Sequence, residues 1–246
     1  MNKVYLVTFG CGKFEKSKWV LYNEAKETGW FDDIFAYGES DVTKYGRSLM
    51  GRGAGYWWWK PIVISFALNK IENDSILLYL DAGCRLNKNG YDRFNEYVGL
   101  CNQSPGFLGF GGKDFSLISS DRTHTKRDLI KLLDCDHKIY LDSNQIGGGI
   151  FFIKKNSFSL KLIDDFINLC KIDHAINDEQ SFHKEYPEFI EHRHDQSVLS
   201  LLVKLRLPEL NRWLLDLCEL SAETYVDPEM RFPIKSRRID DSLITN

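Results

Sequence analysis

The stretch GRGAGYWWWKPIVISFALNKIENDSILLYLDAG, residues 51–83, decides the fold that we expect. It joins an aromatic turn to a short helix at residues 61–70 and then to a strand at residues 76–80. Pro61 suits the first turn of a helix, where its missing N–H costs no hydrogen bond. The strand is a short apolar run with turn residues at both ends, which is typical of a strand covered on both faces in a mostly parallel sheet. The stretch therefore predicts an α/β fold.

Asp81 follows this strand directly. In open α/β sheets ligands bind beyond the carboxyl ends of the strands, so Asp81 stands where a binding carboxylate is expected. Carboxylate oxygens suit Mg²⁺ or Mn²⁺, and such an ion would bridge Asp81 to a diphosphate. The alternative is an aspartate that only begins a turn before Gly83.

The composition is that of a globular protein with one α/β domain. The chain has 246 residues, of which 43% are hydrophobic and 27% charged, enough to bury a sizeable core. Its net charge of −3 argues against nucleic acid as a partner. No run approaches the ~18 apolar residues of a membrane span, and the six cysteines are scattered without metal-ligand spacing. We expect a single domain over residues 1–246 in the reduced cytoplasm.

Apolar runs and helical spacing predict the remaining elements. Strands are expected at residues 3–10, 33–37, 107–110 and 150–154, and helices at 15–29, 91–101, 125–133, 160–170 and 198–205. The polar, glycine-rich stretch 38–55, which contains Arg52, is typical of a binding loop. Residues 111–124 are expected to be loop.

Glycines stand next to two of these strands. Gly10, after Thr8 and Phe9, would let the backbone approach a nucleotide closely, although the GxGxxG fingerprint is absent. Three glycines, 147–149, run into the strand at 150–154 and imply a backbone pressed against something. That neighbour is either a bound sugar or the chain itself at a tight strand entry.

Three consecutive tryptophans precede the helix at 61–70. Trp57 and Trp59 would form a platform for a sugar or base, with Trp58 facing the other way. The alternative is that these rings belong to the core.

Charged residues late in the chain are further candidates. Asp195 opens the helix that carries the apolar run from residue 198, and it would act either as a catalytic carboxylate or as an N-cap, roles that are not exclusive. Arg237 and Arg238 would bind phosphate oxygens or lie as a solvated pair at the surface.

Four motifs together resemble a known family. They are GYWWWKP (55–61), LYLDAGC (78–84), GGG (147–149) and HRHDQS (192–197). The combination is similar to bacterial glycosyltransferases of O-antigen, capsule and exopolysaccharide clusters, over about residues 3–240. The resemblance implies a single GT-A-like (Rossmann-like) α/β/α domain. About residues 1–110 would bind the nucleotide, and about 111–246 would form the acceptor half and the C-terminal tail.

The resemblance also implies an activity. Such an enzyme moves a hexose from a nucleotide-sugar, here a UDP-hexose, to a saccharide on an undecaprenyl diphosphate carrier in lipopolysaccharide synthesis. It works at the inner face of the cytoplasmic membrane and contacts that membrane peripherally. Nothing in the residues names the sugar.

The family's motifs assign roles to particular residues. Asp81 matches the first acid of the family's Asp-x-Asp metal motif, but Gly83 stands in place of the second, and no late metal-binding histidine is present. A weakly held Mn²⁺ or Mg²⁺ is therefore expected, and the alternative is that Lys235, Arg237 and Arg238 neutralise the departing diphosphate without metal.

The candidate site divides into three groups. Asp195 and Gln196 are the catalytic candidates: Asp195 as general base in an inverting enzyme, either of them beside the anomeric carbon in a retaining one. Nucleotide and diphosphate binding is assigned to Thr8, Phe9, Gly10, Arg52, Lys60, Asp81, Gly83, Lys235, Arg237 and Arg238. Sugar and acceptor binding is assigned to Tyr56, Trp57, Trp59, Gly147, Gly148, Gly149 and His194.

Two other functions fit parts of this pattern. The missing second acid would suit a non-catalytic protein that binds nucleotide-sugars or carbohydrates. Strand-end carboxylates with Mg²⁺ would also suit a nucleotidyltransferase, although the turn at residues 10–13 is only a faint form of the loop that such enzymes use.

Overall fold

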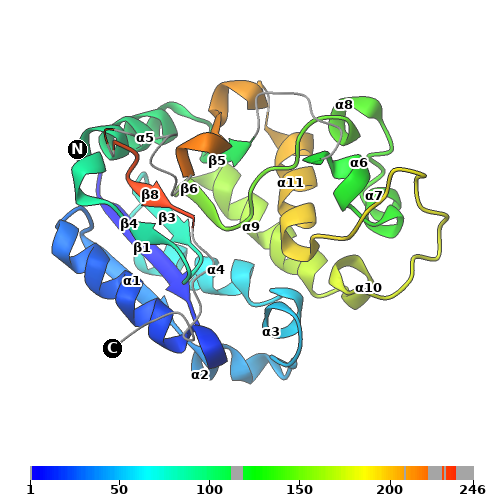
Figure 1. Ribbon diagram of the computed structural model, residues 1–246, viewed down its shortest axis with the longest axis horizontal. Helices are drawn as coiled ribbons and strands as arrows, with labels where there is room; N and C mark the ends of the chain where they lie inside the picture. Colours follow the sequence, from blue (N-terminus) through cyan, green and yellow to red (C-terminus); the bar gives the residue numbers. More distant parts are fainter. Residues whose placement is uncertain (1, 112–118, 208, 221–228, 230, 237–246) are drawn as a thin grey trace.

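The computed structural model describes residues 2–111, 119–207, 209–220, 229 and 231–236, and its centre is a six-stranded sheet in the order β2-β1-β3-β6-β5-β7 (Figure 1). The strands are β1 (Val4–Phe9), β2 (Asp33–Tyr37), β3 (Ile76–Leu80), β5 (Phe107–Gly111), β6 (Ile150–Lys154) and β7 (Leu214–Asp216). The five strands expected between residues 3 and 154 are all present, and β7 was not expected.

Most of the strand pairs in this sheet are parallel. β1 pairs in parallel with β2 and β3, and β5 with β7, whereas β6 runs antiparallel to both β3 and β5. Leu80 at the end of β3 is therefore opposite Ile150 at the start of β6. As a result, the residue after β3 and the residues before β6 lie at the same edge of the sheet.

Helices cover both faces of the sheet, which makes a three-layer α/β/α domain (Figure 1). Residues of α4 (Lys60–Lys70), α9 (Ser157–Cys170) and α11 (His194–Arg206) share one core with alternate residues of β1, β3 and β6, such as Val7, Tyr79 and Phe151. Residues of α1 (Glu15–Thr28) and α5 (Tyr91–Gln103) share the second core with the intervening strand residues, such as Leu6, Leu78 and Phe152. This alternation is why the central strands are apolar throughout.

Short helices make up much of the rest. They are α2 (Glu39–Val42), α3 (Gly53–Tyr56), α6 (Asp121–His124), α7 (Arg127–Leu132), α8 (Lys138–Leu141) and α10 (Asp173–Ile176). The expected loop at 111–124 therefore contains a helical turn, α6. The helix expected at 125–133 is present but shorter, as α7.

A small second sheet places residues 234–235 beside the segment that follows β3. In it β4 (Arg85–Leu86) pairs antiparallel with β8 (Ile234–Lys235), so that Lys235 is opposite Arg85, four residues after Asp81. Among the described residues, no helix is both long enough and apolar enough to cross a bilayer. The six cysteines are free thiols.

Candidate functional site

A buried lysine joins two of the predicted site carboxylates. The ammonium of Lys60 lies 2.6 Å from Asp195 Oδ2 and 3.4 Å from Asp81 Oδ1, and it donates a hydrogen bond to the Gly148 carbonyl at 2.9 Å. The three side chains come from the first residue of α4, the end of β3 and the first turn of α11. The fold therefore gathers residues from three separate motifs at the carboxyl edge of the sheet.

The two carboxylates differ in their access to solvent. The Asp195 side chain is 5% exposed, whereas that of Asp81 is 42% exposed and also accepts a hydrogen bond from the Tyr79 hydroxyl at 2.6 Å. Burial raises the pKa of Asp195 to about 6, although Lys60 opposes the shift. Burial alone would lower the pKa of Lys60, but Asp195 and Asp81 outweigh it, and the net shift is upward. Asp81 is thus the carboxylate that a ligand from solvent can reach, and Asp195 is the enclosed one.

Asp195 is not the N-cap of its helix. The cap position of α11 is Arg193, without a side-chain cap hydrogen bond, and Asp195 lies inside the first turn. Its carboxylate is directed to Lys60 instead. The expected capping role is therefore wrong, because Asp195 lies two residues after the cap position and its carboxylate pairs with Lys60.

Two of the three glycines before β6 are pressed against the other site residues. A Cβ on Gly148 would lie 2.8 Å from the Cβ of Gln196, and one on Gly149 would lie 2.7 Å from Asp81 Oδ2. Gly147 is different, since a Cβ there would meet nothing closer than 3.4 Å. The alternative of a tight strand entry therefore explains Gly148 and Gly149: side chains there would separate α11 and Asp81 from β6.

The rings of Tyr56, Trp57 and His194, three of the residues assigned to sugar and acceptor binding, form one cluster. The His194 ring is stacked on Trp57 with centroids 5.5 Å apart and lies 5.1 Å from that of Tyr56. Its Nδ1 is 2.7 Å from the Ile176 carbonyl and therefore carries the proton. Burial lowers the pKa of His194, so the ring is held neutral.

The backbone beneath this cluster is left-handed. All five residues from Gly53 to Trp57 have φ between 52° and 83°, and His194 has φ 51°. Left-handed backbone costs roughly 1–2 kcal/mol for each residue with a Cβ, which here includes Ala54. Such conformations persist where the surrounding structure enforces them, and they are concentrated at functional sites.

Other assigned side chains are not available to a ligand. Trp59 is buried and stacked on Phe9 with centroids 3.9 Å apart, so the expected platform loses one of its two rings to the core. Trp58 is buried as well. The side chain of Thr8 is also fully buried.

Gly10 is required by its own chain. A Cβ there would lie 2.5 Å from the Phe14 carbonyl oxygen and 2.8 Å from Lys18 Cβ. This close approach to the turn that begins α1 explains the glycine without a nucleotide.

The basic residues assigned to phosphate are in different places. Arg52 lies by the segment that precedes α11, 3.4 Å from Glu191 and 3.7 Å from Asp178. Lys235 lies on β8 beside the strand that follows Gly83. Arg237 and Arg238 are outside the described residues.

Asp81 is the candidate ligand for a divalent ion, and its side chain is accessible to solvent. Within the described part of the chain, no group of three or more histidine, cysteine, aspartate and glutamate side chains could hold a metal. Because Mg²⁺ often keeps several waters and uses one or two carboxylates with substrate phosphates, Asp81 alone fits an ion that the donor itself helps to bind.

The catalytic candidate Gln196 has polar partners behind the site that were missed at the level of sequence. The Gln196 amide donates to Gln145 Oε1 at 2.7 Å, and its Oε1 accepts from the Gly148 N–H at 3.2 Å. A polar stripe along α11 lies behind Gln145. It consists of Ser197, Ser200 and Lys204, whose side chains are buried. Their spacing of three and four residues inside an otherwise apolar helix was the available signal.

Comparison with known proteins shows the fold. No family model matches the chain, and no curated protein matches it. The chain is similar to the crystal structure of a glycosyltransferase involved in the glycosylation of the major capsid of PBCV-1, with TM-score 0.57 and 13% identity over 98% of this chain and 96% of that one. At this identity the likeness establishes the fold, and it confirms the expected single α/β domain with a mostly parallel sheet.

Two further solved structures are less similar to this chain. One is the WbbM bifunctional glycosyltransferase, with TM-score 0.48 and 11% identity over 83% of this chain and 38% of that one. The other is 4-diphosphocytidyl-2C-methyl-D-erythritol synthase from Anaerococcus prevotii, with TM-score 0.39 and 9% identity over 83% of this chain and 98% of that one. Neither is strong enough to carry an argument. The chain thus has the architecture seen in a glycosyltransferase, with its buried lysine and two aspartates at the ligand-binding edge of the sheet.

Proposed function

We propose that this chain is a glycosyltransferase that takes a sugar from a nucleotide-sugar donor to a saccharide acceptor. The observation that carries the proposal is the Lys60 ammonium held between Asp81 and Asp195, while His194, the residue before Asp195, lies against the rings of Tyr56 and Trp57. A cation and an exposed carboxylate suit a diphosphate with its metal, and aromatic faces suit a sugar. The fold shared with a glycosyltransferase supports the same conclusion.

The chemical demands of glycosyl transfer fit the residues at this edge. The departing diphosphate needs positive charge, which Lys60 and Lys235 would supply. The acceptor hydroxyl needs a base, and a carboxylate with a pKa of about 6 is ionised at neutral pH yet basic enough to take a proton. We assign that role to Asp195 if the enzyme inverts the anomeric centre. If it retains, Asp195 or Gln196 would steady charge at the anomeric carbon.

A divalent cation is part of the proposal. Asp81 would hold Mn²⁺ or Mg²⁺ together with the phosphates of the donor. The ion would add positive charge beside the departing diphosphate. Because no group of three or more metal-ligating side chains is present among the described residues, we expect the ion to bind weakly without donor.

The narrower expectations stay predictions. These are a UDP-hexose as donor, an undecaprenyl diphosphate-linked acceptor, a place in O-antigen, capsule or exopolysaccharide synthesis, and peripheral contact with the cytoplasmic membrane from inside the cell. The division into a nucleotide-binding half (about 1–110) and an acceptor half (about 111–246) is a prediction of the same kind. They are what the resemblance to bacterial polysaccharide glycosyltransferases implies.

The first test is a thermal-shift panel of UDP-, GDP-, TDP- and CMP-sugars, each with Mn²⁺ and with EDTA. A donor at 100 times its Kd stabilises the folded state by ~2.7 kcal/mol, which gives a readable rise in Tm. We expect one class of nucleotide-sugar to raise Tm. In Asp81→Asn the part of that rise in Tm that EDTA abolishes in the wild type should be absent.

Turnover separates the alternatives. Release of nucleoside diphosphate from the stabilising donor supports a transferase, binding without release indicates a carbohydrate-binding protein, and a requirement for a nucleoside triphosphate indicates a nucleotidyltransferase. No shift with any donor would contradict the proposal.

A further inference from the structure

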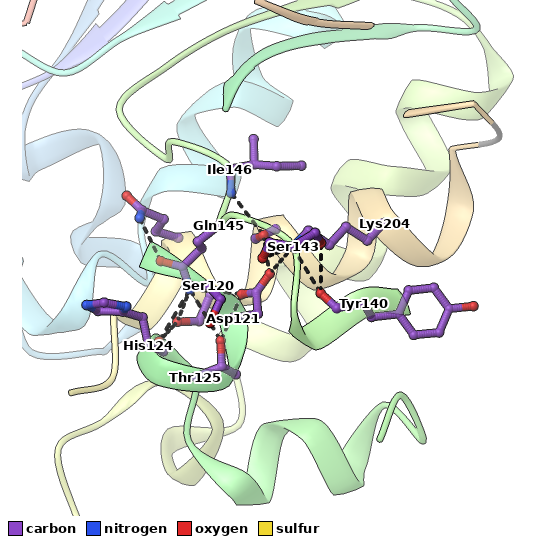
Figure 2. A network of polar contacts seen from close by, with 12 residues as sticks. Ser120, Asp121, His124, Thr125, Tyr140, Ser143, Gln145, Ile146 and Lys204 are labelled. Carbon is purple, nitrogen blue, oxygen red and sulfur yellow. Dashed lines mark hydrogen bonds and ion pairs between the residues drawn. The ribbon is translucent and has the colours of Figure 1, made fainter. Parts of the chain in front are cut away.

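A buried polar network lies behind the candidate site, between α6 and α11 (Figure 2). Its centre is Asp121, whose carboxylate is fully buried and receives four hydrogen bonds. Thr125 and Gln145 donate to its Oδ1, each at 2.9 Å, and Ser200 and Lys204 donate to its Oδ2 at 2.7 and 2.6 Å. Each oxygen therefore has two donors, and the carboxylate is saturated.

Lys204 makes this buried carboxylate possible. Its ammonium is 4% exposed, and besides Asp121 it contacts the carbonyls of Tyr140 and Ser143 at 3.0 and 3.1 Å. Three acceptors satisfy the three protons of the ammonium. Burying such a pair gains little stability over an apolar core, whereas a fully satisfied network holds its members in one arrangement.

The network has a direction that ends in the candidate site. A carboxylate paired with an ammonium only accepts hydrogen bonds, so the end of the Gln145 amide that faces Asp121 must be its NH₂. The carbonyl end of Gln145 then faces Gln196 and must receive the NH₂ of that residue, at 2.7 Å. The carbonyl of Gln196 is left to face the Gly148 N–H at 3.2 Å. Each amide thus fixes the orientation of the next.

Gly148 connects this chain of hydrogen bonds to Lys60. Its N–H donates to Gln196, and its carbonyl accepts from Lys60 at 2.9 Å. The Gln196 side chain is partly exposed, unlike the amide of Gln145, which is 3% exposed. Gln196 is therefore the member of the series that a bound donor can reach.

We propose that Asp121 and Gln145 are positioning residues, which hold the Gln196 amide with its oxygen towards Gly148 and the donor sugar. The inference rests on the proposed function, since it specifies how that site presents Gln196 to the sugar. Without Gln145 the Gln196 amide would keep only its 3.2 Å contact with the Gly148 N–H and would flip more readily, offering NH₂ for part of the time to the developing positive charge. Only the oxygen stabilises that charge, so fixing the amide raises the turnover rate.

Gln145→Met is the variant that tests the proposal. It keeps the length of the side chain and leaves Asp121 with three donors. We expect kcat for donor hydrolysis or transfer to fall at least tenfold, with KM for the donor within about threefold. In a Gln196→Met background the same substitution should change kcat less than twofold, because Gln145 acts through Gln196. Additive effects in the double variant, or unchanged kcat in the single one, would overturn the proposal.

Ser200→Ala is the matched control. Ser200 donates to the other oxygen of Asp121 and accepts from the Ile146 N–H at 3.0 Å, but it does not lie between Asp121 and Gln196. We expect it to lower Tm with kcat within about twofold of the wild type. A tenfold loss of kcat there would mean that any damage to the network impairs catalysis.

A second readout does not depend on activity. The side-chain amide signal of Gln196, assigned by its loss in Gln196→Met, should exchange slowly with solvent in the wild type and shift in Gln145→Met. An unchanged signal would refute the positioning role. If the signal shifts while the wild type turns over no donor, the proposed function fails and the hydrogen-bond series stands.

Discussion

Lys60 and Lys204 are both buried ammonium groups, 3% and 4% exposed, yet their partners differ. Lys204 has one carboxylate, Asp121, which is fully buried and has four donors. Lys60 has two, and one of them, Asp81, is 42% exposed. The first ion pair is closed to any further ligand, whereas the second keeps acceptor capacity at the open edge of the sheet.

The comparison separates a structural ion pair from a functional one. A saturated pair can position its neighbours but has nothing left to offer a substrate. Lys60 lies between an enclosed carboxylate and an exposed one, so a diphosphate or a sugar hydroxyl can still interact with the exposed carboxylate. The distinction lies in the satisfaction of the partners, since the two lysines are equally buried.

The largest effect is expected from Asp195→Asn, which removes the enclosed carboxylate beside Lys60 but keeps its shape. Loss of a positioned base typically costs 10²–10⁴-fold in rate, and we expect kcat to fall in that range. The kcat of Asp195→Asn is measured with the donor that the thermal-shift panel identifies. Asp173→Asn, on the surface beside Arg47, is the control and should stay within about twofold of the wild type. Full activity of Asp195→Asn would remove Asp195 from the mechanism.

Lys204→Met should affect stability more than Lys60→Met. Removing Lys204 leaves Asp121 charged and fully enclosed, which typically costs about 3–5 kcal/mol. Removing Lys60 costs less, because Asp81 is hydrated and Asp195, whose pKa is already about 6, can take up a proton. Urea denaturation at pH 7 compares the two free energies of unfolding. Equal losses would contradict the distinction between a closed pair and an open one.

The pH dependence sharpens the role of Asp195. Its folded pKa of about 6 lies above the ordinary value of 3.8, so the ionised form needed for catalysis accumulates as the pH rises through 6. The rate should fall about tenfold per pH unit below that value. A wild-type profile without this acidic limb would exclude Asp195 as the base.

The raised pKa of Asp195 affects stability in the opposite direction: the rate should rise with pH, whereas the free energy of unfolding should fall. Between about pH 4 and 6 the folded protein binds more protons at Asp195 than the unfolded chain, so the contribution of this residue falls as the pH rises. A shift of about two units corresponds to about 3 kcal/mol. The free energy of unfolding of the wild type, relative to Asp195→Asn, should fall by up to that amount between pH 4 and pH 7.

The smallest effect is expected at two of the glycines that precede β6, Gly147 and Gly148. Gly148→Ala would place a methyl group 2.8 Å from the Cβ of Gln196 and should cost about 1–3 kcal/mol, the usual range for overpacking. Gly147→Ala, with nothing closer than 3.4 Å, should cost under 1 kcal/mol. Thermal denaturation checks both. The reverse order would mean that Gly147 is held by a ligand or partner.

Much of the fold was readable from the sequence. Apolar runs bounded by turn residues, such as Ile76–Leu80, predict strands well because a strand buried on both faces leaves no position for a polar residue. The position of Asp81 followed from the same run, since ligands collect at the ends of such strands. The strand β7 was missed because its three residues are too few to show a pattern.

Only the tertiary structure decided which residues meet. Lys60, Asp81 and Asp195 are far apart in the chain, and the antiparallel insertion of β6 beside β3 brings Gly148 and Gly149 between them. Trp57 and Trp59 look alike in sequence, yet a left-handed turn directs one ring to His194 and leaves the other under Phe9. Local sequence patterns indicate which residues are buried and which are exposed, and this burial determined the layers of the domain. Pairing between charges depends on the path of the whole chain, which no local pattern contains.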